Sequence, residues 1–292
     1  MRSIAITGAN GQIGQSFLAS TALFPELNVK FFDKNDLDVT NPKSIREALR
    51  LEHIDYLINC AAYTNVDKAE SEQSIANQIN GTAVGYLAKY AAKNDITLIH
   101  FSTDYVFDGQ GKEPYSENTT PSPINAYGYS KWLGEQALAK YGQSTYLFRI
   151  QWIYGKNGNN FIKAITKKAT ETGNLAVVND QWGSPTWNQD LAEKILFFLR
   201  ITPGSPKEKP PYGIYHVASQ GHTNWHDFAA EILSQTQIPS TLTAVTSDEM
   251  PRPAKRPPNG RLNCEKFARH APLPLPWTTA LSRYLHETGT QT

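Results

Sequence analysis

TGANGQIG, residues 7–14, is the stretch that decides the fold, because it joins a short apolar run to a helical pattern. Glycines allow a tight bend and leave the backbone bare, while a following helix offers free N–H groups to a pyrophosphate. The spacing is G-x-x-G-x-x-G, whereas the commonest dinucleotide fingerprint is G-x-G-x-x-G. The strand–turn–helix context nevertheless predicts a dinucleotide-binding turn built around Gly8, Gly11 and Gly14.

Apolar runs alternate with helical patterns on both sides of this turn. The runs are apolar almost throughout, which is typical of strands buried on both faces. They predict strands at Ser3–Thr7, Val29–Asp33, Tyr56–Ala62, Thr97–Thr103 and Thr145–Ile150. Helices are expected at Ile13–Leu23, Pro42–Leu51, Ser74–Asn94, Ala126–Tyr141, Gln189–Arg200 and Asn224–Gln235, the last capped by Asn224. This order predicts an α/β fold of the Rossmann type with a doubly wound parallel sheet.

The second half of the chain is richer in proline, which clusters at Pro203–Pro211, Pro251–Pro258 and Pro272–Pro276. Proline lacks an N–H donor, so these segments predict loops and irregular walls. We expect a dinucleotide-binding domain in residues 1–152, to which 187–217 return. A smaller C-terminal substrate-binding portion is expected in residues 153–186 and 218–292.

Composition excludes several classes of protein. The 292 residues carry 28 Lys+Arg against 27 Asp+Glu, so bulk charge attracts no nucleic acid. No apolar run reaches the roughly 20 residues of a membrane helix, and the start of the chain is apolar too briefly for a signal peptide. Cys60 and Cys264 cannot form a disulfide framework. We expect a cytoplasmic protein with no nucleic-acid or membrane partner.

Acidic residues follow the second strand. Asp33 lies about 20 residues past the glycines, where a ribose 2′-hydroxyl is held in dinucleotide-binding folds. Its neighbour Lys34 could instead meet a 2′-phosphate, and Asp33 could be a solvated acid. Asp38 and Val39 follow on a loop where an adenine could lie, although Asp38 is equally suited to a turn.

Tyr127 and Lys131 stand four residues apart at the start of an expected helix, hence on one face. An ammonium there favours the phenolate and is expected to lower the pKa of Tyr127, which makes it a usable acid or base. Tyr129 has Leu133 at the same spacing and no such partner. The alternative is an ordinary surface pair.

Hydroxyl and carboxyl groups follow the fourth strand as Ser102-Thr103-Asp104-Tyr105. Ligand sites of open parallel sheets lie at the carboxyl ends of the strands. Thr103 could therefore hydrogen-bond the same substrate oxygen as Tyr127, while Ser102 should face away. Hydroxyl residues at strand ends are also common turn formers.

Together these features resemble the extended branch of the short-chain dehydrogenase/reductase superfamily, and more closely the dTDP-4-dehydrorhamnose reductase family. The resemblance covers nearly the whole chain. Its most specific segments are NCAAYTNVDKAESE (59–72) and STDYVFDG (102–109). The other matching segments are TGANGQIG (7–14), PINAYGYSKWLGE (123–135), FRIQWIYG (148–155), NNF (159–161), VNDQWGSPT (178–186) and RPPNGRLNCEKF (256–267).

The resemblance implies reduction of dTDP-4-dehydro-β-L-rhamnose to dTDP-β-L-rhamnose by NADPH or NADH. It implies catalytic roles for Tyr127, Lys131 and Thr103, with Asp104 and Trp152 on the sugar. The cofactor contacts that it implies come from Gly11, Gln12 and Ile13 on the pyrophosphate, Asp33, Asp38 and Val39 at the adenosine, Ala62, Tyr63, Thr64 and Phe101 beside the nicotinamide, and Lys131 on its ribose. Trp152 could instead be a core aromatic.

Other candidates carry weaker signals. Asn80 resembles the superfamily's helix asparagine that supports a proton relay, although Asn-Gly is also an ordinary break. Arg252, Lys255, Arg256 and Arg261 form a basic cluster that suits a diphosphate or merely a solvated loop. His222 and His226 lack a third ligand, so we expect no metal site, and Cys60 is expected to be a buried small residue. The resemblance leaves open a Mg²⁺ requirement and a homodimer.

Two rival interpretations remain from the sequence. Nucleotide-sugar dehydratases carry Thr-Asp-Glu where this chain has Thr103-Asp104-Tyr105, which disfavours dehydration; epimerases are less clearly excluded. A non-catalytic regulatory subunit on the same fold is the second rival, against which Tyr127 and Lys131 both argue.

Overall fold

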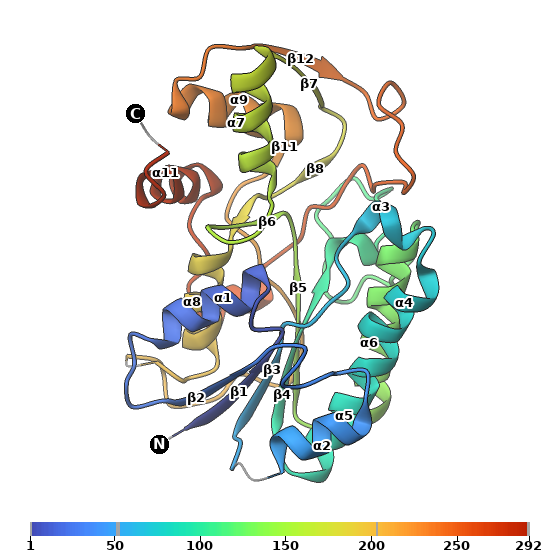
Figure 1. Ribbon diagram of the computed structural model, residues 1–292, viewed down its shortest axis with the longest axis vertical. Coiled ribbons are helices and arrows are strands. Elements are labelled where there is room, and N and C mark those ends of the chain that lie inside the picture. The colour runs from blue at the N-terminus through green and yellow to red at the C-terminus, as the bar shows by residue number, and fades with distance from the viewer. Residues whose placement is uncertain (1, 51–52, 203, 291–292) are drawn as a thin grey trace.

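A six-stranded parallel sheet organises the computed structural model, which describes residues 2–50, 53–202 and 204–290 (Figure 1). The strand order is β10-β5-β4-β3-β1-β2, and every neighbouring pair is parallel. The strands are β1 (Ser3–Thr7), β2 (Asn28–Phe32), β3 (Tyr56–Asn59), β4 (Thr97–Thr103), β5 (Thr145–Ile150) and β10 (Gly213–His216). The order reverses between β1 and β3, which is where ligands bind in open α/β sheets. The expected Rossmann-type α/β fold is confirmed.

Helices cover both faces of this sheet (Figure 1). On one face lie α1 (Gln12–Thr21) and α8 (Asn188–Phe198), and on the other α2 (Pro42–Leu49), α5 (Ala83–Lys93) and α6 (Ala126–Tyr141). Side chains alternate along β1, so Ile4 and Ile6 enter the core with α1 and α8, while Ala5 enters the core with α5 and α6. The carboxyl ends of all six strands therefore share one edge.

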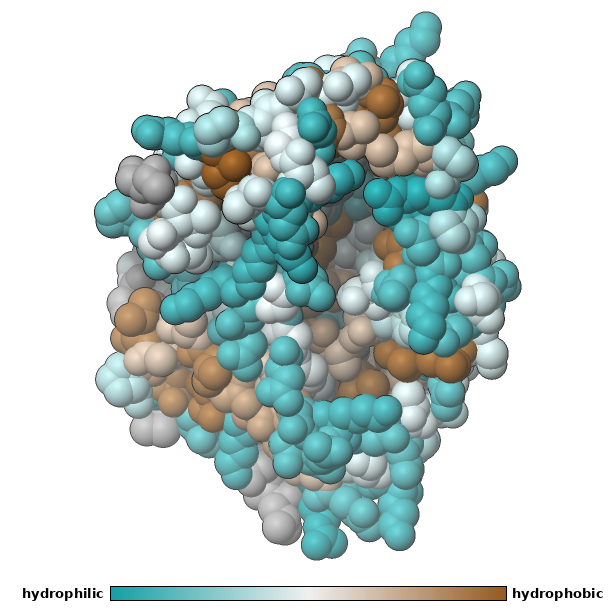
Figure 2. Space-filling model, turned by 45° about the horizontal axis from the view of Figure 1, so that its top comes forward, coloured by the Kyte–Doolittle hydropathy of each residue, from teal (hydrophilic) through white to brown (hydrophobic). Residues whose placement is uncertain are grey.

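A smaller portion with its own core lies beyond that edge. It contains α7 (Phe161–Thr172), α9 (Trp225–Thr236) and α11 (Trp277–Glu287), with the parallel pair β7 (Asn174–Val178) and β12 (Thr241–Val245). Two short pairs connect it to the sheet: β6 (Ile153–Tyr154) with β9 (Thr186–Trp187), and β8 (Trp182–Gly183) with β11 (Thr223–Asn224). Figure 2 shows the surface hollowed between the two portions, with hydrophilic side chains around the rim.

Several elements differ from the sequence-based expectation. The expected helix Ser74–Asn94 is divided into α4 (Gln73–Asn77), a π-helical turn (Gln78–Thr82) and α5. Gly81 in the π-helical turn packs closely on α6, because a Cβ there would lie only 2.8 Å from Leu133. Strand β3 ends at Asn59 rather than Ala62, and β2 ends one residue before Asp33.

The remaining short elements are α3 (Val66–Ala69), a 3₁₀ turn (Asp104–Val106) and α10 (Glu265–Ala268). Asn224 caps α9 as expected, accepting a hydrogen bond from the Asp227 N–H at 2.8 Å. Leu51, the expected end of the second helix, and Pro203 lie outside the described residues. Among the described helices, none has both the length and the apolar character that a membrane crossing requires.

Candidate active site

The glycine turn after β1 is shaped to receive a phosphate group. Gly8 has a φ of +67°, and a Cβ there would lie 2.5 Å from the Ala61 nitrogen in the loop after β3. A Cβ on Gly14 would collide with the Gly8 carbonyl, so helix α1 starts close against the strand. Gly11 is the N-cap of α1 and no side chain caps the helix, which leaves first-turn N–H groups for an anion. These residues fit a dinucleotide pyrophosphate.

Gln12 and Ile13 open helix α1 directly behind this turn. The Gln12 amide donates to the carbonyl of Asn159 at 2.9 Å, and the Gln12 carbonyl accepts from Asn188 at 2.9 Å. Gln12 thus joins the start of α1 to the smaller portion through Asn159 and to α8 through Asn188.

Asp33 lies next to this turn, since Asn10 donates to its carboxylate at 3.3 Å. Backbone N–H groups of Asp36 and Asn35 keep the pKa of Asp33 below its usual value, so it is ionised. Lys34 beside it is exposed. The Asp38 carboxylate accepts from both the N–H and the hydroxyl of Thr40, which also lowers its pKa. Val39 is buried, and this loop suits the adenosine end of a dinucleotide.

Helix α6 positions the candidate acid. Its N-cap Asn125 accepts from the Gly128 N–H at 2.7 Å, which fixes the first helical turn. Tyr127 in that turn is half-buried, and its ring meets Tyr105 edge-on at 5.8 Å between centroids. One turn later, the Lys131 ammonium donates to the carbonyl of Phe101 at 2.6 Å. Tyr127 and Lys131 therefore meet the carboxyl end of β4.

The electrostatics of this pair differ from the expectation. Burial and the neighbouring Asp104 raise the pKa of Tyr127, with a smaller opposing effect from the Thr103 hydroxyl. Burial also lowers the pKa of Lys131 to about 8, while Glu135 opposes that change. The expected lowering of the Tyr127 pKa by Lys131 is wrong for this arrangement, because desolvation of the phenol dominates. Tyr127 therefore keeps its proton and is suited to act as an acid.

Asp104 is the buried carboxyl group of the site, with only 2% of its surface exposed. Thr103 donates to its Oδ1 at 3.0 Å and accepts from the Tyr105 N–H at 3.2 Å. Burial raises the pKa of Asp104 to about 7. Gly260 packs directly on Oδ2, where a larger residue would collide with the carboxyl group. Thr103 and Asp104 thus act as one hydrogen-bonded unit.

A buried ion pair lies behind Lys131. Glu135, one turn further along α6, accepts from Arg149 of β5 at 2.9 and 2.6 Å. Only 1% of Arg149 is exposed, and its third contact is His216 at 3.2 Å. Burial and the Arg149 charge lower the pKa of His216 to about 3, so the imidazole is neutral. Sequence reasoning missed this network because its members come from α6, β5 and β10.

Trp152 follows β5 and forms a wall of the site. Its backbone has a φ of +48°, a conformation that costs energy in a residue with a Cβ. The indole stacks on Trp225 of α9 at 3.7 Å between centroids and packs against Gly183. Trp152 remains half-buried, which fits a ligand-contacting aromatic better than a core residue.

The residues expected beside the nicotinamide differ in their surroundings. Ala62 and Thr64 are exposed in the loop after β3, whereas Tyr63 is fixed by Asn80. The Asn80 amide accepts from the Tyr63 N–H at 2.8 Å, and it donates to the Tyr63 carbonyl and the Ser130 hydroxyl at 2.9 Å each. Asn80 thus holds this loop against α6. The Phe101 ring packs in the core against Phe17 and Phe148, so its carbonyl is the group that serves the site.

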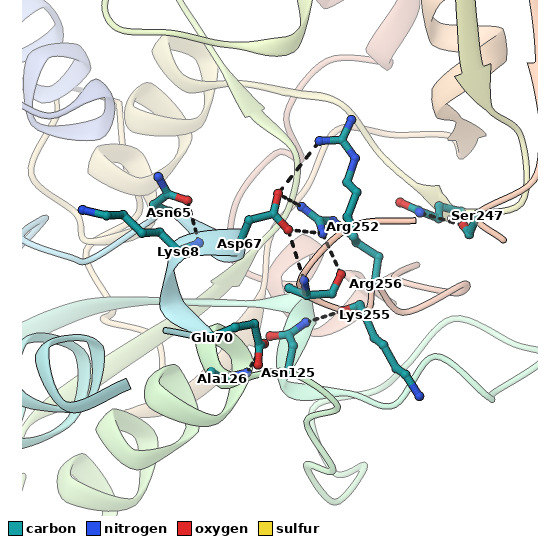
Figure 3. Close-up of polar contacts among 12 residues, drawn as sticks. Asn65, Asp67, Lys68, Glu70, Asn125, Ala126, Ser247, Arg252, Lys255 and Arg256 are labelled. Carbon is teal, nitrogen blue, oxygen red and sulfur yellow. Dashed lines mark hydrogen bonds and ion pairs between the residues drawn. The ribbon is translucent and has the colours of Figure 1, made fainter. Parts of the chain in front are cut away.

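Residues 252–260, which we call the strap, cross from the smaller portion to the sheet (Figure 3). Arg256 of the strap forms a bidentate pair with Asp67 of α3 at 2.6 and 2.8 Å, and Arg252 lies 3.9 Å from the same carboxylate. Asn125, the N-cap of α6, donates to the Lys255 carbonyl at 2.7 Å. The sequence predicted the cluster of basic residues, but nothing near Asp67 in the sequence indicated that it would be their partner.

Arg261, the remaining arginine of the expected basic cluster, directly follows the strap. Arg261 bonds Asn259 at 2.9 Å and the Lys112 carbonyl, whereas the Lys255 side chain points away from Asp67 (Figure 3). Arg256 and Arg261 are thus engaged within the protein. Within the described ranges, no three His, Cys, Asp or Glu side chains gather as metal ligands. Burial raises the pKa of the Cys60 thiol, which keeps it protonated.

This fold and site define an oxidoreductase of the short-chain dehydrogenase/reductase class, with a dinucleotide turn at the sheet's switch point and a Tyr–Lys pair beside it. The family model described as the RmlD substrate binding domain matches residues 1–290. The chain belongs to that family, as its sequence predicts.

Individual relatives are similar to this chain over nearly their full length. The chain is 39% identical to dTDP-4-dehydrorhamnose reductase of Escherichia coli K12, covering 99% of each chain. A crystal structure of a dTDP-4-dehydrorhamnose reductase from Clostridium acetobutylicum superposes with a TM-score of 0.92 at 34% identity, covering 98% of this chain and 99% of that one. The Bacillus anthracis reductase in complex with NADP gives 0.91 at 35% identity, covering 99% and 100%.

Proposed function

We propose that this protein reduces dTDP-4-dehydro-β-L-rhamnose to dTDP-β-L-rhamnose with NADPH or NADH. The observation that carries the proposal is the position of Tyr127, held by the first turn of α6 at the end of β4, beside Thr103 and Asp104, where burial raises its pKa. A reductase of a ketone needs a positioned acid that keeps its proton until the carbonyl oxygen gains charge.

The reaction then divides between the cofactor and the protein. A bound nicotinamide supplies the hydride to the carbonyl carbon at C4. The Tyr127 hydroxyl donates its proton to the carbonyl oxygen, and the Thr103 hydroxyl hydrogen-bonds the same oxygen. The Lys131 ammonium, one turn along α6, stabilises the phenolate that remains and holds the nicotinamide ribose. Holding these groups in one geometry is a large part of catalysis.

The cofactor contacts follow the shape of the sheet edge. Gly8, Gly11 and Gly14 with the start of α1 receive the pyrophosphate, and Asp33 accepts from the adenosine ribose. The proposed further contacts are Gln12, Ile13, Asp38, Val39, Ala62, Tyr63, Thr64 and the Phe101 carbonyl. Residues 1–152 with 187–217 form the cofactor-binding portion, and 153–186 with 218–292 the substrate-binding portion. The sugar lies against Asp104 and Trp152, and we place the reaction in the cytoplasm.

The rival functions are separable. Dehydration needs a second carboxyl group beside Asp104, but Tyr105 stands there, and burial keeps its pKa above the usual value. A regulatory subunit would bind NADPH without turning over the keto sugar. An epimerase would interconvert sugar nucleotides without net consumption of NADPH.

The test is NADPH oxidation with dTDP-4-dehydro-β-L-rhamnose, comparing Tyr127→Phe with the wild type. Loss of the acid should lower kcat by about 10²–10⁴-fold and leave NADPH binding intact. Tyr129→Phe is the matched control, because Tyr129 lies on the same helix with 45% of its surface exposed. NADPH binding without turnover in the wild type would support the alternative of a regulatory subunit. Full activity in Tyr127→Phe would disprove the role of Tyr127 as the proton donor.

A further inference from the structure

Gln151 is a buried amide without a partner. It directly follows β5 and only 2% of its surface is exposed. Neither its amide oxygen nor its amide nitrogen has a hydrogen-bond partner, and among the buried side-chain amides of the described residues Gln151 is the one with both polar atoms unpaired. Buried polar groups are almost always paired, because burying an unpaired amide destabilises a protein. The exception at Gln151 therefore needs a cause.

The position of Gln151 supplies that cause. In the parallel register Ile150 of β5 pairs with Thr103 of β4, so Gln151 follows at the edge where the proposed acid lies. Trp152 comes next, with its positive φ. A Cβ on Gly183 of β8 would lie 2.8 Å from the Gln151 amide oxygen and 2.6 Å from the Trp152 indole. The amide and the indole thus share one wall.

The same wall reaches Asp104 through the strap. The Gly260 N–H donates to the carbonyl of Trp182, the residue before Gly183, at 2.7 Å, and Gly260 packs on the Asp104 carboxyl group. Gln151, Trp152 and Asp104 are therefore linked through one continuous packed layer of β8 and the strap. The glycine turn for the dinucleotide lies after β1, two strands away from β4 in the sheet.

We propose that Gln151 is a specificity-determining residue that hydrogen-bonds a ring hydroxyl of the sugar next to the reacting carbonyl. This inference rests on the proposed function and names a further contact in its substrate site. A neutral amide offers one acceptor and two donors, which match a hydroxyl group that both donates and accepts. The amide carries no charge that would attract a phosphate, whereas Arg252 and Arg256 of the strap are positively charged.

The test uses Gln151→Met, which keeps the length of the side chain and removes both polar atoms. The KM for the keto sugar nucleotide should rise about tenfold, the effect of one lost hydrogen bond, while the Kd of NADPH and of dTDP stays within twofold. The Tm without ligands should stay equal or rise, because an unpaired buried amide is removed. A purely structural role would lower Tm and leave KM unchanged.

The matched control is Gln181→Met. Gln181 is also a buried glutamine, but its amide donates to Ser247 at 2.9 Å. This variant should show the opposite pattern, a lower Tm with an unchanged KM.

A deoxy analogue of the substrate provides a second arm. Removing the contacted ring hydroxyl should weaken wild-type binding about tenfold and leave Gln151→Met binding unchanged, as in a double-mutant cycle. An unchanged KM in Gln151→Met, or a weakened Kd for NADPH alone, would overturn the inference. Absence of turnover in the wild type would instead contradict the proposed function, so the two failures differ.

Discussion

Asp104→Asn should make the protein more stable at neutral pH than the wild type. The carboxyl group is 2% exposed, and burial raises its pKa from 3.8 to about 7. Each pKa unit is worth about 1.36 kcal/mol, so the full change corresponds to ~4 kcal/mol. Asparagine keeps the shape and can still accept from the Thr103 hydroxyl, which donates to Asp104 at 3.0 Å.

The sign follows from proton binding in the two states. Between pH 3.8 and about 7 the folded protein holds the Asp104 proton while the unfolded chain releases it. The contribution of this group to stability is therefore full below pH 3.8 and is lost as pH rises to about 7. From pH 5 to pH 8 the wild type should lose roughly 2–3 kcal/mol that Asp104→Asn does not lose.

Urea unfolding of both proteins at pH 5 and pH 8 measures this difference. The free energy of unfolding of Asp104→Asn minus that of the wild type should increase by roughly 2–3 kcal/mol between the two pH values. Parallel pH dependences of the two proteins would refute the reasoning, because the Asp104 carboxyl would then titrate alike in both states. Thr103→Ala is a control for loss of the hydrogen bond, since it keeps the carboxyl group.

Three further substitutions test the surroundings of the site. Glu135→Gln leaves the buried Arg149 without a countercharge and should reduce the free energy of unfolding by about 3–5 kcal/mol in urea; a change below about 1 kcal/mol would contradict the role of the pair. Arg256→Lys removes the bidentate contact between the strap and Asp67 and should raise the KM for the sugar nucleotide on the order of tenfold in steady-state kinetics. An unchanged KM would show that this contact does not contribute to substrate binding. Gly8→Ala should weaken NADPH binding about 100-fold by fluorescence titration, whereas Gly173→Ala, at a similar φ of +65° but with nothing within 4 Å, should cost about 1 kcal/mol of stability and leave binding unchanged.

The sheet could be predicted in detail where its strands are fully buried. The bounds of β1, β4 and β5 match the expectation, because parallel strands covered on both faces have continuous apolar sequences. The bounds of helix α6 also match the expectation, and its cap, Asn125, is seen only in the structure. Strand β10 was missed because it has four residues and follows a proline-rich segment, and its place is set only by pairing with β5. The parallel pair β7–β12 likewise joins segments far apart in sequence.

In the candidate site, too, local sequence patterns could be predicted and contacts between distant segments could not. The spacing of Tyr127 and Lys131 predicted their shared helix face, and the glycines predicted the turn. The pKa of Tyr127 could not be predicted, since it depends on burial by segments that the spacing does not locate. The Asp67–Arg256 pair joins residues 189 positions apart, and the unpaired amide of Gln151 is a property of the packed interior.

The chain passes back and forth between the α1–α8 core of the sheet and the core of the smaller portion, which has a consequence for evolution and for unfolding. The core under α1 and α8 draws on residues 4–150, then 191–217, then Phe267 and Ala271. The core of the smaller portion draws on residues 154–187, 228–233 and 280–285. Neither half is a continuous piece of the gene, so a recombination event cannot exchange one half as a cassette. A change in the substrate-binding half therefore involves several separate segments of the chain, and because segments of each half flank segments of the other, we expect the two halves to melt together.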